Sequence, residues 1–473
     1  MFRAAVEFFV RLVNYTLSSK MTTPLKRCLS LWEIVVYGVG LILGAGIYVL
    51  IGATAGIAGN MLWLSFLVAS VVAGFTAMSY AELSSLFPKS AAEFVFARAA
   101  FGSDALAWMI GFCAVIIGFT TASAVAVGFA QYLKLFVSID HLFLAFGLIV
   151  LMSLINFWGI KESARFNMVA TAIEAGGLML VIVVGGYQII DNIIPAADLL
   201  ALPQQTQNSS HSLLPVVSAG ALIFFAYLGF EDIANIAEEA ENPQKVLPKA
   251  FIYALVISTV IYILIAVVTV SVVPYQVLAT AEQPLSLVME TLIGGIAPDI
   301  IAIIALFATA NTVLITLIVG ARMLYGMAQG GALPPLLARV HPGRQTPWPA
   351  IVVMALVTLL FLTFRKIEVL ASISDVGIFV LFFAVNLSNI VLRYRQPDLV
   401  RSWRAPLNIG SFPLISALGA LSCLLMLLTI NHPVDIFGKQ ISSLIVGLLI
   451  FALAIPAYFL FGRKGPDANM KTS

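Results

Sequence analysis

The stretch that decides the fold runs from residue 38 to residue 48 and reads GVGLILGAGIY. It lies within an apolar run over 31–57, and about 20 apolar residues are enough for a helix to cross a hydrocarbon core of about 30 Å. Gly44, Ala45 and Gly46 weaken that helix in its middle, because glycine loses the most backbone freedom on folding. An interruption at membrane depth persists only where a cavity or ligand satisfies the freed backbone groups. Gly40 and Gly44 also form a small-xxx-small face, so close helix packing is the alternative interpretation.

The composition identifies the environment of the chain. Hydrophobic residues make up 61% of the 473 residues and charged residues 10%, against about 45–50% and about 25% in soluble domains. A lipid-facing exterior explains both departures, and a membrane barrel would show short alternating strands instead of long apolar runs. We therefore predict an all-α multipass membrane protein with twelve transmembrane helices. The runs lie near 31–57, 61–86, 105–133, 141–160, 166–189, 214–237, 249–273, 298–327, 347–364, 368–392, 411–431 and 440–462.

Charge and reactive residues exclude several classes of function. The net charge of +2 is too small to indicate a nucleic-acid partner. The three cysteines lie far apart, and the four histidines have no spacing that suits a metal or a catalytic triad. We expect no metal, no cofactor and no enzymatic activity.

Lysines and arginines predict the orientation. If the N-terminus is cytoplasmic and the helices alternate, 21 of the 25 basic residues lie on the cytoplasmic side, as the positive-inside rule requires. Both termini are then cytoplasmic in a multi-pass protein of the cell membrane. We divide the chain into an amphipathic N-terminal segment (1–25), which suits the membrane interface, a transport core of helices 1–10 (26–392), and helices 11 and 12 with a cytoplasmic tail (393–473).

A second interior glycine occurs five helices after the first. Residues 224–231 read FFAYLGFE, which sets Gly229 beside the carboxylate of Glu231. Paired interrupted helices at matching places in two halves are typical of inverted-repeat transporters. The N-terminus of a half-helix attracts a carboxylate, and freed carbonyls attract an amine or a cation.

At these motifs the chain resembles the amino acid–polyamine–organocation superfamily, and within it the cationic amino acid transporters and their prokaryotic relatives. The resemblance is carried by the first helix, by the sixth helix with its exit loop, and by the eighth helix with its tail, at residues 30–50, 225–231, 237–244, 321–328 and 331–334. It implies the leucine-transporter fold, in which two inverted five-helix repeats are followed by two further helices. It also implies uptake or exchange of amino acids.

The resemblance assigns roles to individual positions. The amides of Ala45 and Gly46 would bind the α-carboxylate of the substrate. Phe225 would also be an aromatic gate, and Glu231 matches a gating carboxylate of the family. Four carbonyls would receive the α-amine, namely those of Ile42, Phe225, Ala226 and Leu228.

The fifth helix carries a polar stripe at Asn167, Thr171 and Glu174, spaced to share one face. Many proton-coupled relatives of the resembled superfamily carry a lysine at what looks like the position of Glu174, and the lysine ammonium replaces a sodium ion. Burial favours the neutral form of a carboxyl, so we predict that Glu174 carries the coupling proton, with Asn311 and Thr312 as hydrogen-bond partners. A structural, protonated glutamate satisfied by nearby hydroxyls is the alternative.

Helix 8 leaves a sodium-coupled mechanism open. Ala308, Asn311 and Thr312 resemble the pattern that lines the second sodium site of sodium-coupled relatives. Taken alone, Asn311 and Thr312 are also explained as polar groups that hold helices together.

These observations predict secondary active transport of neutral or cationic amino acids by alternating access, with proton symport as the first hypothesis. An exchanger and a sodium-coupled symporter are the alternatives within this class. An amino acid sensor or a channel is the alternative from another class, and it would need a signalling domain or a selectivity-filter repeat. The sequence shows neither, and no phosphate-binding GxxxxGK[ST] loop that would power primary transport.

Overall fold

The computed structural model describes residues 27–134, 136–191, 193, 197–201, 213–281, 283–362, 367–429, 433–436, 439–442, 445, 449, 452, 454–456 and 458–459. The predicted amphipathic segment over 1–25 lies outside these residues. Most of the last apolar run, 440–462, also lies outside them.

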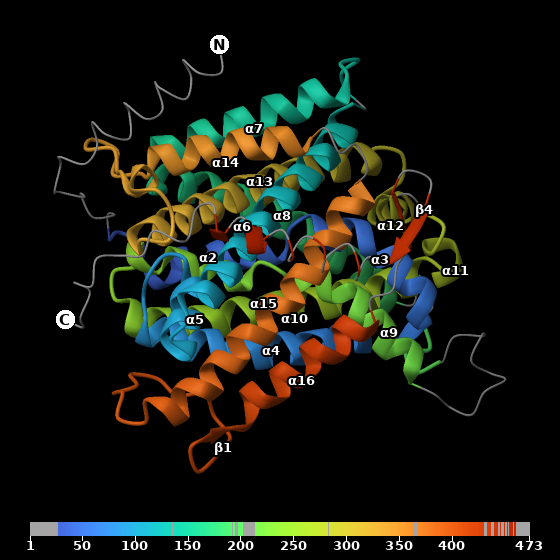
Figure 1. The fold of residues 1–473 in the computed structure, drawn as a ribbon. Coiled ribbons are helices and arrows are strands. Elements are labelled where there is room, and N and C mark those ends of the chain that lie inside the picture. Colours follow the sequence, from blue (N-terminus) through green and yellow to red (C-terminus); the bar gives the residue numbers. More distant parts are fainter. Residues whose placement is uncertain are drawn as a thin grey trace.

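The structure is built almost entirely from helices (Figure 1). The helices before the sixth transmembrane run are α2 (Leu31–Ile42), α3 (Ala45–Ala58), α4 (Leu62–Leu86), α5 (Ala92–Phe101), α6 (Asp104–Leu133), α7 (His141–Trp158) and α8 (Ile160–Ile190). Those that follow are α9 (Leu214–Ile223), η4 (Phe224–Tyr227), η5 (Phe230–Glu239), α10 (Pro243–Val272), α11 (Tyr275–Leu278), α12 (Pro284–Ile293), α13 (Ala297–Gln329), η6 (Pro335–Ala338), α14 (Trp348–Phe361), α15 (Ile367–Arg395) and α16 (Leu414–Thr429).

The prediction of an all-α multipass membrane protein is confirmed. Nine helical spans in the described residues are long and apolar enough to cross a membrane, and three shorter apolar helices accompany them. The count of twelve transmembrane helices stays a prediction, because one of the shorter helices, α12, was not among the predicted spans. The division into transport core and terminal helices also stays a prediction.

Strands are confined to two short antiparallel hairpins among the described residues. β1 (Asn408–Ile409) pairs with β2 (Phe412–Pro413), and β3 (Pro433–Ile436) pairs with β4 (Lys439–Ser442). The first residues of the predicted helix over 440–462 are therefore a strand.

Local sequence explains where several helices begin. Ser30 and Glu33 form a capping box at α2, in which the Ser30 backbone N–H donates to the Glu33 carboxylate at 2.8 Å. Ser103 caps α6 and Asp140 caps α7 by accepting from backbone amides. Gly102, with φ of 64°, turns the chain between α5 and α6.

The packing separates a protein-facing core from a lipid-facing exterior. α10 packs on α4 and α2, and α13 packs on α6 and α8. Large apolar side chains on the outer helices are exposed, such as Phe143 on α7 at 73%, Val183 on α8 at 60% and Leu356 on α14 at 61%. Apolar exteriors of this kind fit lipid better than water.

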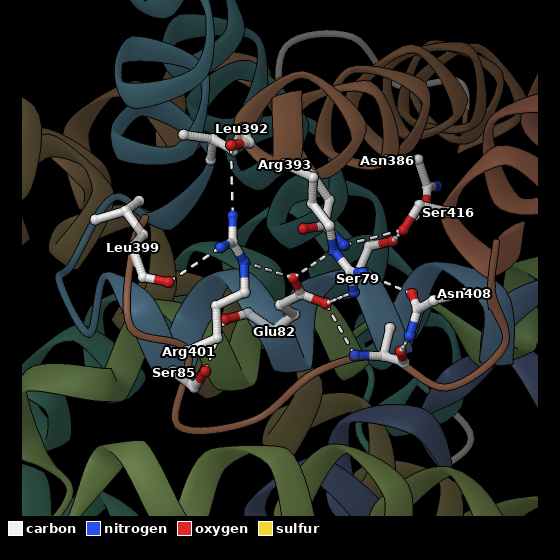
Figure 2. Close-up of polar contacts among 12 residues, drawn as sticks. Ser79, Glu82, Ser85, Asn386, Leu392, Arg393, Leu399, Arg401, Asn408 and Ser416 are labelled. Carbon is white, nitrogen blue, oxygen red and sulfur yellow. Dashed lines mark hydrogen bonds and ion pairs between the residues drawn. The ribbon is translucent and has the colours of Figure 1, made fainter. Parts of the chain in front are cut away.

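A buried charge cluster joins α4 to α15 and the loop beyond it (Figure 2). Both carboxylate oxygens of Glu82 accept from Arg393, at 2.5 Å from Nη2 and 2.9 Å from Nε, and Arg401 Nε donates at 3.2 Å. The backbone N–H of Ala405 adds a fourth bond at 2.8 Å. Each oxygen of Glu82 accepts two hydrogen bonds, and three of the four come from arginines. These bonds offset the free-energy cost of removing the Glu82 carboxylate from water.

Candidate substrate site

The first interruption includes Gly44, where the predicted break over 44–46 begins, and starts one residue before it, at Leu43. α2 ends at Ile42, Leu43 and Gly44 connect the two helices, and α3 begins at Ala45. As the first two residues of α3, Ala45 and Gly46 have backbone N–H groups without an intrahelical acceptor. These N–H groups and the positive end of the α3 dipole form a seat for an anion.

The second interruption replaces a regular helix by tight turns. α9 ends at Ile223, a 3-10 turn follows as η4, and Leu228 is extended. Gly229 then adopts φ of 112° before η5 begins, a conformation that favours glycine. The Glu231 carboxylate accepts from the Gly229 N–H at 2.8 Å, so Glu231 stabilises this turn.

The two interruptions face each other, as predicted. A Cβ on Gly46 would lie 3.0 Å from Cα of Ala226, and a Cβ on Gly229 would lie 2.8 Å from Cβ of Leu41. Neither distance leaves room for a side chain. The backbones of the two interrupted helices therefore approach each other directly.

Tyr262 on α10 connects the interruptions and was missed in the sequence. Its hydroxyl lies within hydrogen-bonding distance of the Ile42 carbonyl and donates to the Ala226 carbonyl at 2.9 Å. Phe66 and Tyr227 pack on its ring with centroids 5.3 Å away. A tyrosine in an apolar run was the only signal in the sequence. Since a carbonyl has two lone pairs, both carbonyls keep one for a further donor.

One cavity of about 100 Å³ collects most of the predicted site. Its lining includes all six predicted substrate residues and two of the predicted coupling and gating residues: Ile42, Ala45, Gly46, Phe225, Ala226, Leu228, Glu231 and Thr312. The Phe225 carbonyl already accepts from the Leu228 N–H at 3.2 Å. Glu174, Ala308 and Asn311 are not among the lining residues.

A chain of polar groups lies behind α2 on α8 and α13. Asn311 Nδ2 donates to Thr171 Oγ1 at 3.3 Å, and Thr171 Oγ1 donates to Asn167 Oδ1 at 3.2 Å. A Cβ on Gly40 would collide with Thr171 Oγ1 and would lie 2.7 Å from Asn167 Oδ1. Close packing thus explains Gly40, which lets α2 lie against the polar face of α8.

Glu174 is fully buried, and neither carboxylate oxygen has a hydrogen-bond partner among the described residues. The expected bonds from Asn311 and Thr312 to Glu174 are absent from this part of the chain. The Asn311 amide reaches Thr171 instead, one turn earlier on α8, and the Thr312 hydroxyl donates to the Ala308 carbonyl at 3.0 Å. Among the described residues no hydroxyl donates to Glu174, and its role as the carrier of the coupling proton stays a prediction.

The cavity extends toward three carboxyl groups, Glu93 on α5 and Glu231 and Asp232 on η5. Tyr80 Oη donates to Glu93 at 3.0 Å and Asn235 Nδ2 donates to it at 3.3 Å. Burial raises the pKa of the Glu93 carboxyl above its usual value, and these hydrogen bonds oppose that rise. The sequence did not single out Glu93 as a site residue, because it lies outside the predicted spans.

Comparison with known proteins agrees with this architecture. A family model described as amino acid permease matches residues 29–459. The branched-chain amino acid permease of Bacillus subtilis is 30% identical over 471 residues, 94% of this chain and 95% of the relative. The methylthioribose transporter of the same organism is 29% identical over 95% of this chain and 96% of its own length. The vacuolar cationic amino acid transporter 4 of Arabidopsis thaliana is 30% identical over 79% of this chain and 64% of its own length.

These relatives are named as permeases and transporters, and the family match covers the region that contains both helix interruptions and the cavity between them. The chain therefore belongs to the amino acid permease family.

Proposed function

We propose that this chain is a secondary active transporter that carries amino acids across the membrane by alternating access. The observation that carries the proposal is the pair of facing helix interruptions, which border one cavity between α2, α3 and the turns around η4. Free N–H groups on one side and carbonyls on the other are complementary to the two charged ends of a zwitterion.

In this proposal the α-carboxylate binds the amides of Ala45 and Gly46. The α-amine binds the carbonyls of Ile42 and Ala226, which Tyr262 holds in place from behind. The carbonyls of Phe225 and Leu228 complete the amine site, and the Phe225 ring covers the substrate as a gate. Glu231 secures the turn at Gly229 through which η5 moves during gating.

Proton symport is the coupling mode that we propose, with Glu174 as the proton carrier. A fully buried carboxyl without a partner in the described residues favours its neutral form. Release of the proton would leave a buried charge, so protonation and the arrangement of α8 against α2 are linked. A sodium ion bound between Glu174 and the residues Ala308, Asn311 and Thr312 is the rival mechanism, and obligatory exchange is another.

The test uses Glu174→Gln, which keeps the shape of a neutral carboxyl but cannot release a proton. We expect the variant in proteoliposomes to lose accumulation driven by a pH gradient and to keep exchange of internal for external substrate. Glu290→Gln, the same substitution at an exposed position on α12, should behave like the parent protein. Imposed proton and sodium gradients are compared in parallel.

Accumulation by the Glu174→Gln variant at the parental level under a pH gradient would show that Glu174 is structural. Accumulation by the parent protein only under a sodium gradient would favour the sodium mechanism. An absence of net uptake with intact exchange in the parent protein would identify an exchanger.

A further inference from the structure

The loop between α15 and α16 (396–413, called the α15–α16 loop below) presents large apolar side chains outside the transmembrane helices. Val400, Leu407 and Ile409 are 90%, 65% and 67% exposed. The hairpin of β1 and β2 carries Ile409 at the edge of the molecule, directly before α16 (Figure 1). Apolar side chains that gather in one exposed loop indicate a contact surface.

Buried hydrogen bonds hold the α15–α16 loop in place (Figure 2). The Ala405 N–H donates to the Glu82 carboxylate of α4 at 2.8 Å, and Arg393 Nη1 donates to Asn408 Oδ1 at 2.6 Å. Successive side chains of a strand point to opposite faces, so Ile409 points away from the face on which Asn408 contacts α15. Turning Ile409 inward would require these bonds to break.

Leu407 adopts a backbone conformation that leucine rarely has. Its φ is 55°, a left-handed value that glycine and asparagine adopt more readily. The Leu407 carbonyl accepts from the Leu414 N–H at 3.2 Å, which closes the loop onto the first residue of α16. An exposed leucine in a strained conformation is unfavourable in water on two counts. Strain of this kind is often found at functional sites, and contact with lipid would remove the cost of exposing the side chain.

The length of α16 brings the hairpin close to the lipid. With 16 residues this helix is about 24 Å long, which is shorter than a hydrocarbon core of about 30 Å. Leu421 and Leu425 on α16 are 53% and 54% exposed, so the helix belongs to the lipid-facing exterior. A short helix places the residues next to it inside or beside the hydrocarbon core unless the bilayer thins. We therefore expect the hairpin to lie where the acyl chains meet the headgroups.

Positive charge is in excess around the hairpin. Residues 393–413 contain four arginines and one aspartate, and the buried Glu82 offsets one positive charge, so an excess of two remains. Arg404 is exposed and has no hydrogen bond or ion pair within the described part of the chain. The planar guanidinium of arginine can bind two phosphate oxygens at once. Apolar side chains beside such an arginine are complementary to an anionic phospholipid, which offers acyl chains and a phosphate.

We propose that the α15–α16 loop is a binding site for an anionic phospholipid of the membrane face that it borders. Leu407 and Ile409 insert among the acyl chains, and Arg404 binds the lipid phosphate. Because the same loop is bonded to Glu82, the bound lipid holds the end of α4 against α15. This site is separate from the cavity between the helix interruptions, so the proposal does not depend on the transported substrate.

The first experiment measures the depth of residue 409 in the membrane. Full-length Ile409→Cys carries a fluorescent label in nanodiscs that contain phosphatidylglycerol, and the quenchers are nitroxides on the acyl chains or iodide in the water. We expect quenching by the nitroxides and protection from iodide. The control is Lys89→Cys, exposed on the same predicted side, where we expect the reverse. Quenching of residue 409 by iodide would place the hairpin in water and overturn the proposal. Protection from both quenchers would mean that protein, such as a second copy of this chain, covers the hairpin, and it would also overturn the proposal.

The second experiment tests the phosphate contact with Arg404→Gln. Lipid bound to the purified protein is measured by native mass spectrometry in mixtures of phosphatidylglycerol and phosphatidylcholine. We expect the preference for phosphatidylglycerol to fall about fivefold, the contribution of one arginine beside an anionic membrane surface. Arg344→Gln removes another exposed arginine on the same predicted side and should keep the parental preference. An unchanged preference in Arg404→Gln, or no preference in the parent protein, would overturn the phosphate site.

Leu407→Gly separates lipid contact from a structural role. Glycine adopts a φ of 55° without strain, so the variant should keep the parental denaturation temperature in detergent. When it is combined with Ile409→Cys, quenching of the label by acyl-chain nitroxides should decrease, because the loop has lost one of its two inserted side chains. A lower denaturation temperature with unchanged quenching would show that Leu407 packs against protein, and its insertion into lipid would be wrong.

Discussion

At Gly46 the backbone is the surface that faces the second interruption. A Cβ at this position would lie 3.0 Å from Cα and 3.3 Å from Cβ of Ala226. The contact involves backbone atoms, which cannot rotate away as a flexible side chain can. Even the smallest side chain at residue 46 must therefore displace the turn of η4. This side chain would also lie beside the amides that we propose to bind the carboxylate.

We predict that Gly46→Ala reduces substrate affinity by at least tenfold while the protein still folds in the membrane. Binding is measured with labelled substrate on purified protein, and folding by size-exclusion elution of the same sample. Gly128→Ala is the control within the membrane, because a Cβ on Gly128 meets no atom within 4 Å. Normal affinity in Gly46→Ala would place the carboxylate site elsewhere.

Among the elements, η5 is held at its end by a buried ion pair to α13. Arg322 Nη2 lies 2.9 Å from Oε1 of Glu239, with both side chains at most 1% exposed, and Arg322 Nη1 donates to Asn156 on α7 at 3.0 Å. The Glu239 carbonyl accepts from the N–H groups of Cys28 and Leu29, just before α2. Arg322 thus ties the ends of both interrupted helices to α7 and α13.

Removing one partner of this pair should be strongly destabilising, because the other charge stays buried without compensation. We predict that Arg322→Met lowers the free energy of unfolding by about 3–5 kcal/mol. Arg98→Met is the comparison: Arg98 pairs with Asp104 at 2.7 Å, but these side chains are 31% and 60% exposed, and such pairs contribute about 0–1 kcal/mol. Thermal denaturation in detergent compares the stability of the two variants. A similar loss of stability in both would contradict the role of burial.

For the whole molecule, the distribution of basic residues predicts which face is cytoplasmic. Lys89 is exposed in the loop between α4 and α5, on the predicted cytoplasmic side. Asp198 is exposed in the segment that follows α8, on the predicted outer side. The three native cysteines all lie in the described residues, where they are buried and form no disulfide, so they should contribute little background to thiol labelling.

We therefore predict that an impermeant maleimide labels Asp198→Cys in intact cells and labels Lys89→Cys only after permeabilisation. The unmodified protein measures the background. The reverse pattern would invert the topology, and labelling of both positions from outside would contradict the predicted number of crossings between them.

Several features of the site could be predicted from short stretches of the chain. Gly44 and Gly229 marked the interruptions, because the helix propensity and the positive φ of glycine are local properties. The polar stripe of Asn167 and Thr171 on α8 was also readable from helical spacing. The surroundings of Glu174 were not, since the bond expected from Asn311 goes to Thr171 and neither Glu174 oxygen has a hydrogen-bond partner among the described residues.

The sequence alone determined that the chain is a helical membrane protein, where its helices are interrupted, and which family it resembles. Composition, the length of apolar runs and backbone propensity depend on the sequence itself and not on contacts between distant residues. They can therefore be read before the fold is known. Only the tertiary structure decided that Tyr262 bridges the interruptions and that Glu93 borders the cavity. Tyr262 and Ile42 are 220 residues apart, and contacts over such separations depend on which helices cross and at what register.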